Sequence, residues 1–270
     1  MSLDPVAERG MVLLGCGKMG SALLAGWLAR GVAPESVHVI DPAPSDWLMA
    51  QGVAVNEALP DAPAVVLLAV KPQMMGTALP AIAAYGGGAT LFLSIAAGTS
   101  LAQLGAALGD TSPIIRAMPN TPAAVGRGVS ALIGNEHRSE ADMGLADALM
   151  AAVGTTLRLE NEAQMDAVTA LSGSGPAYVF HLIEAMAKAG EVEGLAPEMA
   201  MKLARATVIG AGELAHQATE SAEELRVNVT SPGGTTAAAL SVLMDPESGL
   251  PPLMARTIRA AAARSRELSQ

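Results

Sequence analysis

The sequence predicts an α/β protein in two parts: an N-terminal doubly wound sheet over residues 1–160, followed by an all-α domain over residues 161–270. In the first half, short apolar runs alternate with helical stretches, and most of the runs are continuous Val, Ile, Leu and Ala, as in parallel strands covered on both faces. After Glu160 we find no convincing strand, only long patterns rich in Ala and Met.

Seven apolar segments have the character of strands. They are Met11–Leu14, Val37–Ile40, Ala64–Val70, Thr90–Ile95, Pro113–Ala117, Val129–Ile133 and Thr155–Leu159. Helical patterns fill the gaps between them, for example over Ser21–Ala29 and Leu101–Leu108. Strand, helix and strand in succession imply right-handed crossovers and therefore a doubly wound sheet.

The second half is predicted to be entirely helical. Its segments are Ala163–Leu171, Pro176–Ala189, Pro197–Ala218, Ala222–Val227, Thr235–Val242 and Leu253–Leu268. Many of them are apolar over more than one stripe, which indicates burial on several sides. We expect part of this surface to be buried in a partner subunit; an ordinary helical core is the alternative.

Composition excludes several classes of function. A net charge of -10 argues against nucleic acid, whose phosphates need a basic footprint. The single cysteine rules out an internal disulfide and favours a reducing compartment, and the N-terminus lacks a secretion pattern, so we expect a cytoplasmic protein. Residues 72–109 carry no charge, but glycines and polar residues divide them into pieces shorter than the roughly 20 residues of a membrane span. No His pair or carboxylate cluster has metal-ligand spacing.

A glycine-rich loop joins the first predicted strand to the first helix. It consists of Gly15, Cys16, Gly17, Lys18, Met19 and Gly20 and fits the pattern G-x-G-x-x-G. The first glycine allows the tight turn, the second lets the backbone approach a pyrophosphate, and the third permits close helix packing. A tight turn without a ligand is the alternative, but the position between strand and helix favours a Rossmann-type dinucleotide site.

Asp41 ends the second predicted strand, 21 positions after Gly20. An acid at this distance binds the adenosine ribose hydroxyls and repels the 2′-phosphate of the phosphorylated cofactor. No Lys or Arg occurs between Asp41 and Val70 to offset that repulsion. The residues therefore favour NADH, unless Asp41 merely starts the turn through Pro42 and Pro44.

Later segments resemble the pyrroline-5-carboxylate reductase family. They are Leu68-Ala69-Val70-Lys71-Pro72, Met118-Pro119-Asn120-Thr121-Pro122, Leu171-Ser172-Gly173-Ser174-Gly175-Pro176-Ala177-Tyr178 and Asn228-Val229-Thr230-Ser231-Pro232-Gly233-Gly234-Thr235-Thr236. The similarity extends from the glycine loop to about Leu268. It implies hydride transfer from NAD(P)H to the C=N bond of 1-pyrroline-5-carboxylate, giving L-proline, in a homodimer formed through the helical domain or in a decamer.

The run from Ser231 to Thr236 precedes an Ala-rich helix, and its glycines leave backbone N–H groups bare. Such a helix start suits a small carboxylate without any arginine. A helix start capped by Ser231, with nothing bound, is the alternative reading of these residues. The resemblance implies that Ser231, Gly233 and Gly234 hold the substrate carboxylate, with a backbone contact from Thr235. It also implies that Thr236 contacts the ring nitrogen as the catalytic hydroxyl.

The resemblance also implies further cofactor contacts. They are Asn56, Ala69, Val70, Lys71, Pro72, Ala96, Ala97, Gly98, Asn120 and Thr121, with Glu162 and Asn228 as contacts from the helical domain. One departure concerns the cofactor: many family members have Ser, Asn, Arg or Thr where this chain has Asp41, and they prefer NADPH. NADH is expected to be accepted here.

The proposed chemistry needs little from the protein, because an imine takes its proton from water and the cofactor supplies the difficult step. None of the four histidines lies in a predicted site segment. Two rivals stay open: a related imine or hydroxyacid reductase of the same two-domain plan, and a non-catalytic dinucleotide sensor.

Overall fold

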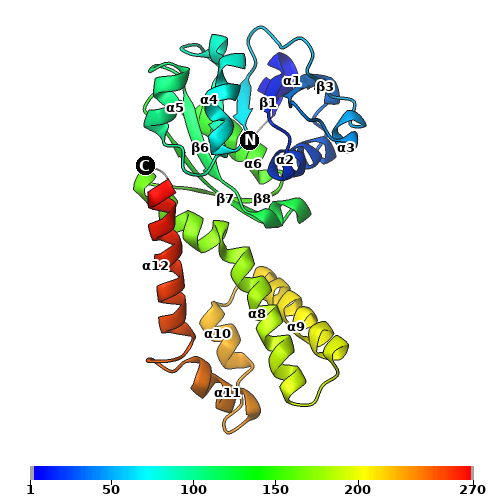
Figure 1. Cartoon of the computed structure of the whole chain (residues 1–270), viewed down its shortest axis with the longest axis vertical. Coiled ribbons are helices and arrows are strands. Elements are labelled where there is room, and N and C mark those ends of the chain that lie inside the picture. Colours follow the sequence, from blue (N-terminus) through cyan, green and yellow to red (C-terminus); the bar gives the residue numbers. More distant parts are fainter. Residues whose placement is uncertain (1–2, 269–270) are drawn as a thin grey trace. The chain divides into compact units, whose positions relative to one another are not determined.

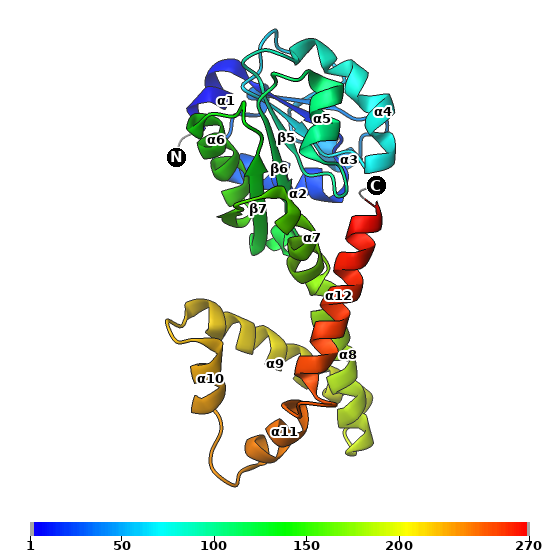
Figure 2. The same cartoon turned by 90° about the vertical axis from the view of Figure 1, so that its left-hand side faces the viewer.

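The computed structural model describes residues 3–268, which form two compact units. The first comprises residues 3–173 together with 262–268, and the second is Ser174–Ala261. The domain boundary after residue 160 stays a prediction. Figure 1 shows the sheet of the first unit covered by helices, and Figure 2 shows the same elements after a quarter turn.

An eight-stranded sheet forms the centre of the first unit. Its strands are β1 (Met11–Leu14), β2 (Val37–Ile40), β3 (Ala54–Val55), β4 (Val65–Leu68), β5 (Leu91–Ser94), β6 (Ile114–Met118), β7 (Gly128–Gly134) and β8 (Gly154–Arg158). Their order is β3-β2-β1-β4-β5-β6-β7-β8, with only the β6–β7 pair antiparallel. The doubly wound sheet and all seven predicted strands are confirmed; the two-residue β3 was not predicted.

Helices cover both faces of the sheet. The helical segments of this unit are α1 (Asp4–Arg9), α2 (Lys18–Ala29), η1 (Pro34–Ser36), α3 (Asp46–Met49), η2 (Pro72–Met74), α4 (Met75–Ala78), η3 (Leu79–Ala81), η4 (Ala83–Tyr85), α5 (Leu101–Leu108), η5 (Thr121–Val125), α6 (Glu140–Ala151), η6 (Glu162–Gln164), α7 (Met165–Val168) and η7 (Thr169–Gly173). Alternate residues of β1 enter two cores: Leu13 packs in the cluster that holds Leu23 of α2, and Leu14 in the one that holds Leu104 of α5.

Two helical predictions need correction. The helix expected over Ala163–Leu171 is divided into the 3-10 turn η6, the short α7 and the π-helical η7. Helix α6 was not predicted, although Ser139 and Asp142 form a capping box at its start. The buried Trp27 indole donates a hydrogen bond to the Leu149 carbonyl of α6 at 2.9 Å, which ties α6 to α2.

The uncharged stretch over residues 72–109 contains β5 and several short helices instead of one long helix. Among residues 3–268, no helix is both long enough and apolar enough to cross a membrane.

The second unit is helical, as predicted. Its helices are α8 (Gly175–Val192), α9 (Pro197–Gln217), α10 (Ala222–Asn228), α11 (Thr235–Leu243) and most of α12 (Leu250–Leu268). Its buried cluster contains only Ala187, Ala200 and Ala204, with Ile183 packed beside it. Phe180 and Ile209, by contrast, are 61% and 62% exposed. So much uncovered apolar surface marks an interaction surface.

Candidate active site

The carboxyl ends of four parallel strands meet at one edge of the sheet. Leu14 of β1 is in register with Ile40 of β2 and Leu68 of β4, and Leu68 is in register with Ser94 of β5. The predicted cofactor residues that come next in the chain are 15–20, Asp41, 69–72 and 96–98. Open α/β sheets bind ligands at this edge.

The three glycines of the loop after β1 have different surroundings. Gly15 has a φ of 89°, and a Cβ there would lie 2.9 Å from Cγ1 of Val70. At Gly20 a Cβ would lie 2.7 Å from the Gly15 carbonyl oxygen, so a side chain is excluded by close packing. At Gly17 a Cβ would meet no atom within 4 Å. The loop is therefore tightly packed on both sides of an open position at Gly17.

Helix α2 starts at this open position. The first helical hydrogen bond of α2 runs from the Ser21 amide to the Gly17 carbonyl oxygen at 2.8 Å. The amides of residues 18–20 therefore have no carbonyl acceptor within the helix. Gly17 is the N-cap, and no side chain caps it. The Lys18 side chain is exposed, whereas Met19 packs against the core. A bare helix start beside an open glycine fits the pyrophosphate of a dinucleotide.

Asp41 joins the glycine loop to the end of β2. Its Oδ2 accepts a hydrogen bond from the Cys16 amide at 2.7 Å, and its Oδ1 accepts one from the Ala43 amide at 2.8 Å. Burial, and secondly the Asp41 charge, raises the pKa of the Cys16 thiol to about 11. Cys16 is thus a neutral thiol near neutral pH, as expected of a residue that only fills space.

The Asn56 side chain is held by the backbone of Asp41. Its Oδ1 accepts from Asp41 N at 3.0 Å, and its Nδ2 donates to Asp41 O at 2.8 Å. Asn56 has a φ of 56°, a left-handed conformation that Asn tolerates better than most residues. Both ends of the Asn56 side-chain amide therefore position Asp41. The sequence predicted only a contact of Asn56 with the cofactor, not this role.

The segment after β4 lies next to the glycine loop, and the segment after β5 lies next to the end of β4. Ala69 N donates to Leu14 O at 2.8 Å, and Ile95 N donates to Leu68 O at 3.0 Å. Lys71 is exposed, and η2 begins at the next residue, Pro72. After β5, Ala96 is buried, Ala97 is exposed, and Gly98 has a φ of 77°.

Asn120 follows β6 and is 9% exposed. Its Oδ1 accepts from Val129 N at 2.9 Å, and its Nδ2 donates to Ser172 O at 3.2 Å. Thr121, the first residue of η5, is exposed. The Asn120 side chain thus links β7 to η7, while Thr121 stays accessible.

Glu162 was expected to act from the helical domain, but it lies in the first unit. Its Oε1 accepts from Nη1 of Arg116 and from the amide of Leu101. Arg116, on β6, was not among the predicted site residues. Its only signal in the sequence is a charge within the apolar run Ile114-Ile115-Arg116-Ala117.

The predicted substrate residues lie at the start of α11 in the second unit. Gly234 is the N-cap and no side chain caps it, so the alternative in which Ser231 caps the helix is wrong. Gly233 has a φ of 70°, and Ala238 N makes the first i to i−4 bond, to Gly234 O, at 3.2 Å. The amides of Thr235 and Thr236 precede that bond. Asn228 is the exposed last residue of α10.

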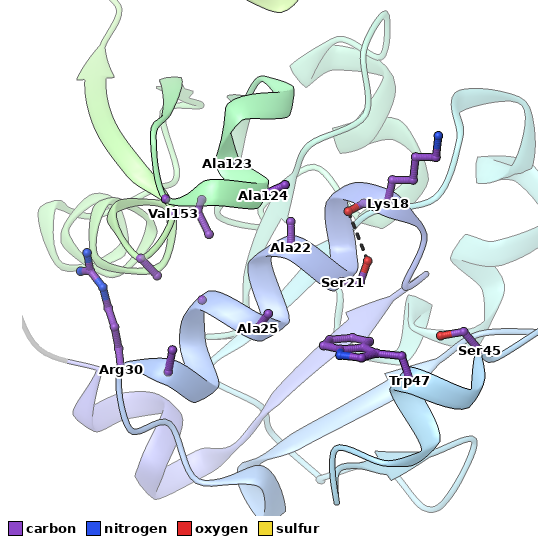
Figure 3. Close-up of a pocket in the computed structure, with 14 residues that line it drawn as sticks. Lys18, Ser21, Ala22, Ala25, Arg30, Ser45, Trp47, Ala123, Ala124 and Val153 are labelled. Carbon is purple, nitrogen blue, oxygen red and sulfur yellow. Dashed lines mark hydrogen bonds between the residues drawn. The ribbon is translucent and has the colours of Figure 1, made fainter. Parts of the chain in front are cut away.

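A pocket of about 640 Å³ lies along the outer side of α2 (Figure 3). Figure 3 shows the Trp47 indole beside Ser21, with Ala123 and Ala124 of η5 on the other side of the helix. Of the predicted cofactor residues only Lys18 lines it. This pocket is therefore distinct from the open position at Gly17. Among residues 3–268, no group of three or more His, Cys, Asp or Glu side chains could hold a metal ion.

Two family models match the chain. Residues 162–268 match a model described as pyrroline-5-carboxylate reductase dimerisation, and residues 11–98 match one described as NADP oxidoreductase, coenzyme F420-dependent. The first match coincides with the helices that expose apolar side chains, and the second with the strands that carry the glycine loop.

Similar proteins are found over almost the whole length. A pyrroline-5-carboxylate reductase of Pseudomonas aeruginosa is 41% identical, with 96% of this chain and 97% of that protein covered. One of Synechocystis is 40% identical, with the same coverage of 96% and 97%. The solved structure of the Coxiella burnetii reductase has a TM-score of 0.91 at 34% identity, covering 97% and 99% of the two chains. A Plasmodium falciparum pyrroline carboxylate reductase with NADP bound has a TM-score of 0.82 at 27% identity, covering 97% and 98%.

Proposed function

This chain belongs to the pyrroline-5-carboxylate reductase family and is an NAD(P)H-dependent oxidoreductase acting on the C=N bond of 1-pyrroline-5-carboxylate, and we propose which of its residues carry that reaction. The structural observation that supports a dinucleotide cofactor is the open position at Gly17, at an uncapped helix start on the ligand-binding edge of the sheet. The predicted reductase activity agrees with these findings, and a non-catalytic sensor is not favoured by any of them.

We propose that the glycine loop binds the pyrophosphate of the cofactor through the amides at the start of α2. Residues 69–72 would line the cofactor near its ribose and pyrophosphate. Residues 96–98, with Asn120 and Thr121 close by, would lie beside the nicotinamide, which supplies the hydride when bound. The side chain of Asn120 is already bonded to Val129 and Ser172, so its contribution is to shape this surface.

Asp41 supports the proposal that NADH is accepted. Each of its carboxylate oxygens already accepts one amide, but a carboxylate offers about four acceptor positions, so ribose hydroxyls still find acceptors. A 2′-phosphate at the same place would be repelled by the charge. The preference between NADH and NADPH stays a prediction.

In the second unit, the amides of Gly233 and Thr235 are proposed to hold the substrate carboxylate, while the Gly234 amide donates to the Ser231 carbonyl oxygen at 3.1 Å and shapes the turn before α11. Gly234 carries no side chain, no side chain caps the helix, and no acidic residue lies in its first turn, so the positive end of the helix is available for an anion. Ser231 is exposed next to it and adds a hydroxyl donor. Thr236 is proposed to hydrogen-bond the ring nitrogen.

The proposed residues bind and orient; they do not form an acid–base pair. Among the histidines, His38 has its Nδ1 3.0 Å from the Ala58 carbonyl and His181 pairs with Glu184, and neither belongs to a site segment. Holding the two reactants in a reactive pose is worth several kcal/mol, and water can supply the proton of the imine.

The exposed apolar side chains of the second unit, together with the match to a dimerisation model, support a homodimer formed through these helices. A decamer and a cytoplasmic location stay predictions.

The purified protein should oxidise NADH or NADPH in the presence of 1-pyrroline-5-carboxylate, with proline as product, followed by loss of cofactor absorbance. Oxidation with hydroxyacids or other imines but not with this substrate would favour the rival reductase instead. If the protein binds the cofactor but does not oxidise it in the presence of any of these substrates, the assignment is contradicted.

A further inference from the structure

A buried arginine of the first unit is linked through one carboxylate to the start of a helix. Arg116 is 8% exposed, and its Nη1 donates to Glu162 Oε1 at 2.5 Å. The same oxygen accepts the amide of Leu101, the first residue of α5, at 2.7 Å. Arg116, Glu162 and the start of α5 thus form one connected chain.

This chain of contacts encloses the loop between β5 and α5. Arg116 is in register with Ser94, the last residue of β5, and Ser94 Oγ accepts the amide of Ala96 at 3.3 Å. Leu101, at the other end of the loop, is held by Glu162. Between the two ends, Gly98 has a φ of 77°, a conformation that glycine adopts easily. The Arg116–Glu162 pair therefore connects both ends of residues 95–100.

Stability alone does not account for a charge at this depth. A buried ion pair can often be replaced by apolar side chains without loss of stability, because the attraction mainly compensates for lost hydration. Ile114, which shares its face of β6 with Arg116, is buried and apolar, so this face of the strand has no general need for an arginine. Glu162 is one-third exposed, and it is the partner that reaches the loop.

We propose that Arg116 is a positioning residue that acts through Glu162 to hold residues 95–100 in the shape that binds the nicotinamide end of the cofactor. This inference rests on the proposed function, because that function places residues 96–98 beside the nicotinamide. Arg116 itself need not touch the cofactor; its effect passes through the Leu101 amide.

The test compares two ion pairs of the same unit. Arg116→Met and Glu162→Gln disturb the proposed pair, while Arg158→Met and Asp147→Asn disturb a control pair on β8 and α6, where Arg158 Nη2 lies 2.7 Å from Asp147 Oδ2. NADH binding is measured by equilibrium titration, turnover by cofactor oxidation, and folding by the thermal midpoint Tm.

We expect Arg116→Met to weaken NADH binding by about tenfold to a hundredfold, since small misplacements of site residues have effects of this size. The control variants should stay within about twofold of the wild type. Glu162→Gln keeps an oxygen for the Leu101 amide, so its Kd should lie between those of the wild type and Arg116→Met. Because Arg116 acts through Glu162, the double variant should bind NADH no worse than Arg116→Met alone.

Equal NADH affinity in Arg116→Met and Arg158→Met would overturn the proposal, and so would additive losses in the double variant. If Arg116→Met does not fold, the comparison of Glu162→Gln with Asp147→Asn decides in the same way. Failure of the proposed function looks different: the wild type would bind NADH without oxidising it in the presence of 1-pyrroline-5-carboxylate, and the NADH titrations would still decide the role of Arg116.

Discussion

Replacing Gly17 by alanine separates folding from cofactor binding. Gly17 has φ −70° and ψ −161°, which alanine can adopt, and the added Cβ would meet no atom within 4 Å. Alanine reduces the entropy of the unfolded chain, worth about 0.4–1 kcal/mol, but it is a poorer N-cap than glycine by a similar amount. The two effects offset, so the free energy of unfolding should change by less than about 1 kcal/mol, and Tm by less than about 4 °C.

Binding should respond differently, because the new methyl group occupies the space through which a pyrophosphate approaches the amides of α2. Losing one hydrogen bond to a charged group costs about 1.5–3 kcal/mol. The Kd for NADH should therefore rise about 10- to 150-fold.

The assay is a fluorescence titration of NADH together with thermal unfolding. Gly144→Ala is the matched control, because a Cβ at Gly144, inside α6, also meets nothing within 4 Å. That variant should be more stable by about 1 kcal/mol and should bind NADH like the wild type. If Gly17→Ala binds NADH as tightly as the wild type, the pyrophosphate does not lie at this loop and the site assignment must be abandoned.

Three further changes test the site. Asp41→Asn should raise the ratio of kcat/KM for NADPH over NADH about 5- to 150-fold, because a unit charge about 5 Å away is worth about 1–3 kcal/mol; an unchanged ratio would mean that Asp41 does not face the ribose. The pKa of Cys16 is raised from 9.0 to about 11 by burial and then by Asp41. Between these values the unfolded thiol releases its proton while the folded one keeps it, so the free energy of unfolding should fall by up to about 2–3 kcal/mol as pH rises. Urea unfolding at about pH 8 and about pH 10.5 should show this drop in the wild type but not in Cys16→Ala, and identical drops would exclude the thiol as the cause. Thr236→Ala should lower kcat about tenfold through loss of one hydrogen bond, while Thr236→Ser keeps most of it; full activity in Thr236→Ala would remove this hydroxyl from the mechanism.

The sheet could be predicted well because burial on both faces leaves a strong local signal. The strands β1, β4 and β5 are buried along their whole length, and such a strand reads as an unbroken apolar run. Strand β3 has only two residues and α7 only four, so neither is long enough to produce a periodic pattern. The capping box of α6 was present in the sequence, but the apolar residues of α6 spread around the helix instead of forming one stripe, so α6 was not predicted.

The candidate site was predicted by residue type and order, from the glycine loop, Asp41 and the run before α11. These signals lie in the sequence because each depends on neighbouring residues: a turn needs its glycines, and a helix start needs bare amides.

Only the tertiary structure decided how the polar side chains are used. Asn56 is bonded to Asp41, Asn120 to Val129 and Ser172, and Glu162 to Arg116 and Leu101. These partners lie 9 to 61 residues apart in the chain, and the hydrogen bonds between them depend on which strand ends meet at the sheet edge. A sequence pattern therefore predicted which residues surround the cofactor, whereas the three-dimensional arrangement showed which of these residues hold the others in place. A hydrogen bond is set by distance in space and not by separation along the chain.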